Sequence, residues 1–144
     1  MSATADSSLV VALYLNEADS VRADVACASV APPIRLTDLH RVEISNAFQR
    51  AVKNGRISAE QAELLWHDFT ADVLAGRFEI VAIDHATVFA RTLALTQKHT
   101  AITGTRSLDL IHIATALEIG ATDFLSFDNR QRQTAISEGL KVIP

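Results

Sequence analysis

The chain is poor in the features that define several common classes of protein. It has 144 residues and one cysteine, Cys27, which excludes an intramolecular disulfide framework and fits a reducing compartment. Its longest early apolar run, Leu9–Leu15, is far shorter than the roughly 20 residues that cross a bilayer. The opening residues, MSATADSS, lack the basic segment of a secretory signal. We therefore expect a cytoplasmic protein without a membrane partner.

Positive charge is also scarce. There are 13 lysines and arginines against 17 aspartates and glutamates, which gives a formal net charge of −4. This balance argues against binding nucleic acid through bulk charge, but it is compatible with an acidic site that meets phosphates through a metal ion. Apolar residues, in contrast, make up 49% of the chain, enough for the core of one domain over residues 1–144.

One stretch, Arg106–Arg130, combines the signals of a buried helix, a stop and a buried strand. Ser107 is predicted to be the N-cap of a helix over residues 108–119. That helix is apolar on nearly every side, which indicates that it is buried. Gly120 is predicted to end it, and Phe124–Phe127 has the composition of a buried strand.

Two acids lie in this stretch at positions where an ionised side chain is hard to place. Asp109 falls in the first turn of the buried helix, and Asp128 directly follows the strand. The simplest account is that Asp109 caps the helix and Asp128 forms a turn. The alternative is a binding site, because an ionised carboxylate in an interior requires a cation or hydrogen-bond donors.

The whole chain alternates between predicted strands and predicted helices. The strands are predicted at residues 3–5, 34–36, 79–83, 124–127 and 140–143. The helices are predicted at residues 7–15, 20–28, 38–53, 59–73, 85–99, 108–119 and 131–138, with a mobile loop at 100–105. This alternation indicates an α/β fold, with a central parallel sheet of about five strands and helices on both faces.

Four acids are predicted to meet at one edge of this sheet. Asp6 and Asp128 follow strands at the carboxyl edge, where ligands bind in open α/β sheets, and the helices that carry Glu43 and Asp109 begin at the same edge. At an effective dielectric constant of 20, two carboxylates about 5 Å apart repel by roughly 3 kcal/mol, so a cation is needed. Carboxylates without thiolates or paired histidines suit Mg²⁺ or Mn²⁺ rather than zinc. The chemistry indicated is phosphodiester hydrolysis.

The order, residues and spacing of these segments resemble those of the PIN domain, and within that family those of the VapC-type ribonuclease toxins of type II toxin–antitoxin systems. The match covers nearly the whole chain as an ordered set of motifs, whereas a single acid would carry little weight. One departure is the small-residue strand Ala3–Ala5, where the family places bulky aliphatic residues. The matching segments are Asp6-Ser7-Ser8-Leu9, Leu13-Tyr14-Leu15-Asn16-Glu17, Glu43 followed by Lys53-Asn54-Gly55-Arg56-Ile57-Ser58, the Asp-x-x-His-x-Ala-x-Ala-x-x-x-Gly helix Asp109–Gly120, and Ser126-Phe127-Asp128.

The resemblance implies that Asp6, Glu43, Asp109 and Asp128 are the metal-binding and catalytic acids, with Asp6 and Asp109 as direct ligands. It implies Mg²⁺ as the cofactor, for which Mn²⁺ can substitute, and RNA as the substrate. It also implies a small cognate antitoxin that blocks the acidic pocket, and a homodimer. The helical face around residues 65–73 is our candidate for self-association.

Several neighbouring side chains are candidates for supporting roles. Ser7 and Ser126 are expected to hydrogen-bond a carboxylate or a metal-bound water. Arg106 and Arg130 are candidates for holding RNA phosphates, with ordinary surface charge as the alternative. His112 is interpreted as a hydrogen-bonded core histidine rather than a general base.

Two functions of different classes are therefore carried forward. The first is a Mg²⁺-dependent endoribonuclease that acts as the toxin of a toxin–antitoxin pair. The alternative is a PIN-fold binding module that associates with an antitoxin or with itself without efficient catalysis. A phosphoacceptor receiver domain would need an acid pair after the first strand and a lysine near the C-terminal end of the last strand. It is disfavoured, because Asp6 stands alone and Lys141 lies inside the final predicted strand.

Overall fold

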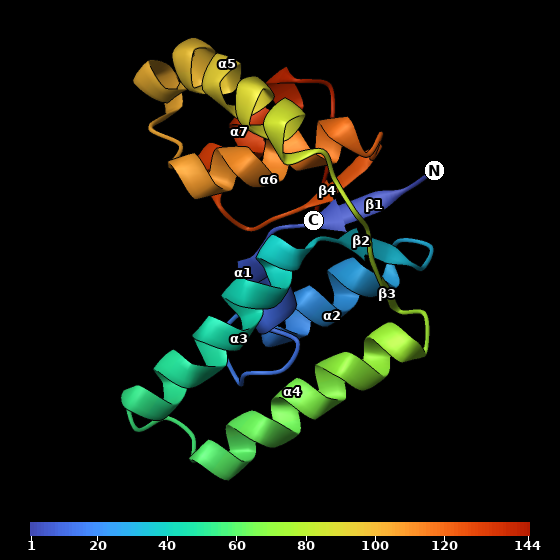
Figure 1. Cartoon of the computed structure of the whole chain (residues 1–144), viewed down its shortest axis with the longest axis vertical. Helices are drawn as coiled ribbons and strands as arrows, with labels where there is room; N and C mark the ends of the chain where they lie inside the picture. Colours follow the sequence, from blue (N-terminus) through green and yellow to red (C-terminus); the bar gives the residue numbers. More distant parts are fainter.

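Five short parallel strands form the centre of the molecule (Figure 1). They lie in the order β3-β2-β1-β4-β5, and every neighbouring pair is parallel. This arrangement confirms the predicted α/β fold with a central parallel sheet. In the computed structural model, which describes residues 1–144, the strands are β1 (Ala3–Ala5), β2 (Ile34–Leu36), β3 (Phe78–Ile80), β4 (Asp123–Leu125) and β5 (Lys141–Ile143).

Helices cover both faces of the sheet. In Figure 1, α5, α6 and α7 lie together on one side of the strands, and α1 to α4 lie on the other. No helix combines the length and the apolar character that crossing a bilayer requires. The helices are α1 (Ser7–Val11), α2 (Ser20–Ala28), α3 (Asp38–Lys53), α4 (Ala59–Leu74), α5 (His85–Thr103), α6 (Ser107–Glu118) and α7 (Asn129–Ser137).

The sheet separates two hydrophobic clusters. Residues of β1, β2 and α1 to α4 form the larger cluster, in which Phe69 lies 5.9 Å from both Tyr14 and Phe78 between ring centroids. Residues of α5, α6, α7 and β4 form the smaller one. Successive residues of β4 face different clusters, since Phe124 belongs to the smaller and Leu125 to the larger. A strand buried on both faces explains why the successive residues Phe124 and Leu125 are both apolar although they face opposite sides of the sheet.

The predicted mobile loop at residues 100–105 is wrong. Helix α5 continues to Thr103, so only 104–106 connect it to α6. The Thr103 hydroxyl donates to the His99 carbonyl one turn back, which lets a polar residue remain helical. The helix stops at Gly104, whose φ of 69° is the left-handed conformation that ends helices.

Other element boundaries also differ from the predicted ones. Helix α1 ends at Val11 rather than at residue 15, and β3 and β4 each begin one residue earlier than predicted and end two to three residues earlier. Ser107 is the first residue of α6 rather than its N-cap, which is Arg106. Helix α7 begins at Asn129, two residues before the predicted start, because the Asp128 side chain caps it.

The aromatic cluster gives a test of the larger core. Phe69 is 1% exposed, and truncating it to alanine leaves a cavity beside Tyr14 and Phe78. We expect Phe69→Ala to lower the free energy of unfolding by about 3–5 kcal/mol in urea denaturation. Leu64 is the matched control on the same helix, because it is 63% exposed. Leu64→Ala is expected to change stability by only about 0.5 kcal/mol, and equal losses for the two variants would contradict this packing.

Candidate metal-binding site at the sheet edge

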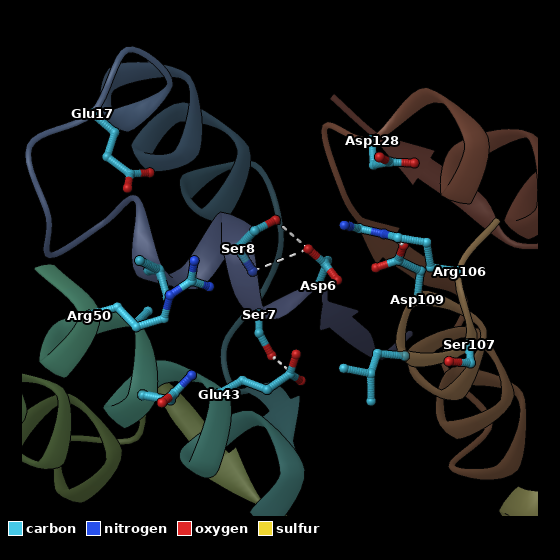
Figure 2. Close-up of a pocket in the computed structure, with 14 residues that line it drawn as sticks. Asp6, Ser7, Ser8, Glu17, Glu43, Arg50, Arg106, Ser107, Asp109 and Asp128 are labelled. Atoms are coloured by element: carbon cyan, nitrogen blue, oxygen red, sulfur yellow. Dashed lines mark hydrogen bonds and ion pairs between the residues drawn. The ribbon is translucent and has the colours of Figure 1, made fainter. Parts of the chain in front are cut away.

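A cavity of about 660 Å³ opens beyond the carboxyl ends of β1 and β4 (Figure 2). The strand order turns at this point, since β2 and β3 lie on one side of β1 and β4 and β5 lie on the other. Such switch points are where parallel α/β sheets bind ligands. All four acids singled out in the sequence line the cavity: Asp6, Glu43, Asp109 and Asp128.

Three of these acids lie at helix N-termini, where exposed N–H groups favour negative charge. Asp6 is the N-cap of α1 and Asp128 the N-cap of α7, and Asp109 lies in the first turn of α6. Glu43 lies further along α3 and reaches the cavity from another side. The local sequence around each acid therefore places it, through capping and helix phase, at the same edge of the sheet.

Asp6 is buried and fully engaged by protein donors. Its Oδ2 accepts hydrogen bonds from the backbone N–H and the hydroxyl of Ser8, and its Oδ1 accepts one from Gln131 Nε2 at 3.0 Å. Burial alone would raise the pKa of Asp6, but the charge of His112 and these hydrogen bonds outweigh burial and lower it. The carboxylate at the end of β1 is therefore held in its ionised form.

Glu43 is held by two side chains from other elements. Ser7 Oγ donates to Glu43 Oε1 at 3.0 Å, and His112 Nε2 lies 2.6 Å from the same oxygen. The second carboxylate oxygen, Oε2, has no protein donor. Burial would lower the pKa of His112, but the hydrogen bond to Glu43 and the charges of Asp6, Glu43 and Asp109 together raise it. The three carboxylates thus favour the protonated form of His112.

Two histidine rings contact each other at a tilt of 52° next to the acids. The rings of His40 and His112 lie 4.4 Å apart between centroids, and both are almost fully buried. His40 Nδ1 accepts from the Thr37 backbone N–H, so its proton lies on Nε2, which donates to the Ala5 carbonyl at 2.8 Å. Burial and the neighbouring His112 lower the pKa of His40 to about 3.

His112 is buried and hydrogen-bonded, in line with its interpretation as a core histidine, but its partner is an acid of the cavity. Its Nε2 contacts a cavity acid, and its buried Nδ1 has no hydrogen-bond partner. A buried ring nitrogen without a partner is unusual in a histidine that serves only the core. The spacing of three residues between Asp109 and His112 was the available signal, because it puts both on neighbouring faces of α6.

Asp109 has a cationic partner that sequence reasoning did not identify. Arg106 Nε lies 2.9 Å from Asp109 Oδ2, three residues away along the chain. The hydrogen bond and charge of Asp109 raise the pKa of Arg106 further above its ordinary value. The N-cap position of α6 places Arg106 next to the acid in the first turn of the same helix.

Gln131 connects three sides of the site, and sequence reasoning missed it. Its Nε2 donates to Asp6 Oδ1 at 3.0 Å and to the Asp109 carbonyl at 3.1 Å, and its backbone N–H donates to Asp128 Oδ1 at 2.8 Å. Ser126 Oγ donates to Gln131 Oε1 at 2.5 Å. We had expected Ser126 to contact a carboxylate or a metal-bound water, but its hydroxyl donates to the amide of Gln131 instead. The signal for Gln131 was its position three residues after Asp128, which is the spacing of a capping box.

Of four other charged residues near the site, two lie outside the cavity and two line it. Arg130 does not line the cavity and is exposed on α7. Arg132 Nη1 donates to the Ser126 carbonyl at 2.8 Å, which gives it a structural role. Glu17 and Arg50 do line the cavity. Arg50 follows Glu43 by two helical turns, and this spacing could have identified it.

The donor set of the cavity fits a hard divalent cation. Its walls offer carboxylate and hydroxyl oxygens, with no cysteine or histidine among the lining residues. No three acidic, histidine or cysteine side chains converge closely enough to form a ready metal cluster. The carboxylates share the cavity but are turned toward separate protein donors. This arrangement is compatible with Mg²⁺, which keeps several waters and takes only one or two carboxylates directly.

The fold and the cavity define a class of protein: a parallel α/β domain with an acidic pocket at the switch point of its sheet. The family model for the PIN domain matches residues 4–137. The chain therefore belongs to the PIN domain family, as the sequence motifs implied.

Two solved structures share this fold. The toxin–antitoxin complex from Klebsiella pneumoniae matches with a TM-score of 0.62 at 18% identity, over 90% of this chain and 89% of that chain. The crystal structure of FitAcB from Neisseria gonorrhoeae matches with a TM-score of 0.71 at 14% identity, over 98% of this chain and 96% of that chain. At these identities the likeness establishes the fold alone. No curated protein sequence matches the chain significantly.

The histidine pair gives a test of the charges under the cavity. In long-range ¹H–¹⁵N spectra of metal-free protein, we expect His40 to remain neutral, with its proton on Nε2, down to pH 5. The ring of His112 is expected to be mostly protonated at pH 6.5, the ordinary histidine value, because its pKa is raised. A protonated His40 or a neutral His112 under these conditions would contradict the arrangement.

The two shifts affect stability in opposite senses. Because the pKa of His40 is lowered to about 3, its contribution is complete above pH 6.5 and is lost as the pH falls. The loss approaches about 1.4 kcal/mol per pH unit below the unfolded-state pKa. Because the pKa of His112 is raised, its contribution is complete below pH 6.5 and is lost as the pH rises through the folded-state pKa.

Proposed function

We propose that this PIN domain is a Mg²⁺-dependent endoribonuclease that acts as the toxin of a toxin–antitoxin pair. The observation that carries the proposal is that four acids from four separate elements line one cavity at the switch point of the sheet. Mn²⁺ is a suitable substitute, because it prefers the same oxygen ligands. The choice of RNA and the role as a toxin rest on the resemblance of the motifs to VapC-type toxins.

Asp6 and Asp109 are the acids proposed to hold the ion directly, and Glu43 and Asp128 are the other two acids of the site. A divalent ion held there would polarise a phosphoryl oxygen and would make the attacking water easier to deprotonate. Glu43 is suited to orient that water, because Ser7 and His112 hold only one of its oxygens. His112 itself is buried beneath Glu43, so its proposed role is to position that carboxylate.

Gln131 and Ser8 have the task of keeping Asp6 ionised and oriented. Their hydrogen bonds reach both oxygens of the carboxylate, and Ser126 fixes the amide of Gln131 in turn. Partners of this kind commonly change metal affinity or activity by about 10- to 100-fold when removed. We therefore propose that Gln131 and Ser126 support metal binding without touching the ion.

An antitoxin is the proposed protein partner. One structure of this fold is a toxin–antitoxin complex, and the acidic cavity is a surface that such a partner would need to cover. A basic side chain of the partner, inserted among the acids, would satisfy the same charges as a metal ion. We place both proteins in the cytoplasm, where the RNA substrate is found.

A homodimer is proposed as the second association, through α5. The helical face around residues 65–73 was predicted to mediate self-association. Its residues Leu65 and Val73 pack against the larger core cluster, so they are not available for a partner. Phe89 and Leu93, one turn apart on α5, are 58% and 60% exposed. We expect sedimentation at twice the mass of the chain, and a monomer for Phe89→Glu, since a charge on an apolar contact opposes association. A monomeric parent protein would contradict this assignment.

The central test removes single charges from the cavity. We expect Asp6→Asn and Asp109→Asn each to reduce Mg²⁺-dependent RNA cleavage by at least about 100-fold, because each removes a ligand or its charge. Chelation with EDTA is expected to abolish cleavage by the parent protein. Mg²⁺ should also raise the Tm of the parent but not that of Asp6→Asn, which reports binding independently of activity.

Asp19→Asn is a matched control for Asp109→Asn. Asp19 pairs with Arg22 at 2.8 Å with the same spacing of three residues, but it lies outside the cavity. Asp19→Asn is expected to change Tm by only a few degrees, since exposed ion pairs contribute about 0–1 kcal/mol, and the Tm of Asp109→Asn reports whether the substitution at this buried position leaves the fold intact. If Asp109→Asn cleaves RNA as well as Asp19→Asn does, the proposal is wrong. Growth arrest on expression that persists in Asp6→Ala would favour the binding-module alternative.

A further inference from the structure

We propose that Arg50 holds a phosphate of the substrate strand next to the phosphodiester that is cut, and so acts as a positioning residue. This inference rests on the proposed function and deepens it, because it names the contact that orients the strand. The substrate class it specifies is a single strand with a phosphate on each side of the scissile bond. Arg50 is a residue of α3 that lines the cavity, and its guanidinium points into it (Figure 2).

The phase of α3 explains why Arg50 faces the acids. Glu43, Ala47 and Arg50 follow one another at intervals of four and three residues, and all three line the cavity. Residues with this spacing lie on one face of a helix. Ala47 is small, so the space between the acid and the arginine stays open. In Figure 2, Arg50 reaches in from the side opposite Arg106 and Asp109.

Arg50 is the cavity cation without an acidic partner. Arg106, the other arginine of the lining, is bound to Asp109 at 2.9 Å. Glu17, another acid of the lining, pairs instead with Arg56 at 3.6 Å. Arg50 makes no ion pair or side-chain hydrogen bond within the protein. A guanidinium directed into a cavity with all of its donors free is suited to an anion supplied by a ligand.

The charge balance of the cavity shows why such an anchor is needed. Five acids line it, against two arginines, one of which is already paired. A nucleic acid strand carries one negative charge per phosphate, so the acidic wall repels every phosphate that no metal ion contacts. A guanidinium binds a phosphate through two parallel hydrogen bonds and fixes its orientation as well as its charge. Arg50 is placed to do this across the cavity from Asp6.

The test compares Arg50→Gln, Arg50→Lys and a matched control, Arg41→Gln, by steady-state cleavage of a single-stranded RNA oligonucleotide with Mg²⁺. Arg41 lies on the same helix but pairs with Asp38 at 3.1 Å outside the cavity. We expect Arg50→Gln to raise KM about 10-fold with kcat within about twofold, because uniform binding is lost. Its log–log slope of affinity against salt should become shallower by about 0.7 to 1. Arg50→Lys should fall between, and Arg41→Gln should match the parent protein.

The outcomes separate this inference from the proposed function. If the parent protein cleaves RNA and Arg50→Gln keeps its KM and salt slope, the role of Arg50 is overturned and the nuclease stands. A loss of kcat with unchanged KM also overturns it, since that indicates a contact made only in the transition state. If the parent protein does not cleave, the proposed function fails. Fluorescence anisotropy of the same oligonucleotide then decides the inference, which is overturned if the parent protein and Arg50→Gln bind equally.

Discussion

The structure depends on one ionised carboxylate at the end of a buried strand. Asp6 follows β1 at the centre of the sheet, and its backbone N–H donates to the Leu125 carbonyl at 2.8 Å, which extends the pairing of β1 with β4 by one step. The carboxylate is 6% exposed, and an unpaired charge at that depth would be severely destabilising. Gln131 and Ser8 supply hydrogen bonds, and His112 supplies opposite charge. Asp6 thus interacts with three helices, through Gln131 of α7, His112 of α6 and Ser8 of α1.

The histidines show how the core and the cavity share this charge. The low pKa of His40 keeps its ring neutral beside His112, whose pKa is raised. His112 lowers the pKa of Asp6 through its charge and contacts Glu43 directly. One buried histidine therefore interacts with two carboxylates of the cavity, which favour its protonated form. Because His112 is buried and does not line the cavity, the wall of the cavity stays acidic.

Much of this arrangement was predictable because local rules determine it. The strand–helix alternation gave the parallel sheet, and the strand ends and helix starts gave the four acids at one edge. The partners of those acids were not predictable in the same way. Gln131 reaches Asp6 across 125 residues of sequence, and His112 reaches Glu43 across 69, so only the packing of α3, α6 and α7 brings them together. Arg106 was predicted either to hold RNA phosphates or to be an ordinary surface charge, and its pairing with Asp109, three residues away, was not considered.

The distribution of hydrogen bonds also bears on how the cavity would select its ligand. Each acid already has a protein donor, so a cation must compete with Gln131 and Ser8 at Asp6, and with Arg106 at Asp109. The Arg106 contact is the easiest to displace, since the Arg106 side chain is 75% exposed, although that of Asp109 is only 12% exposed. If the cavity binds the proposed ion and RNA, displacing this guanidinium from Asp109 would leave it free to contact a phosphate. Metal binding and substrate binding would then be coupled through Arg106, because the charge freed by the first event serves the second.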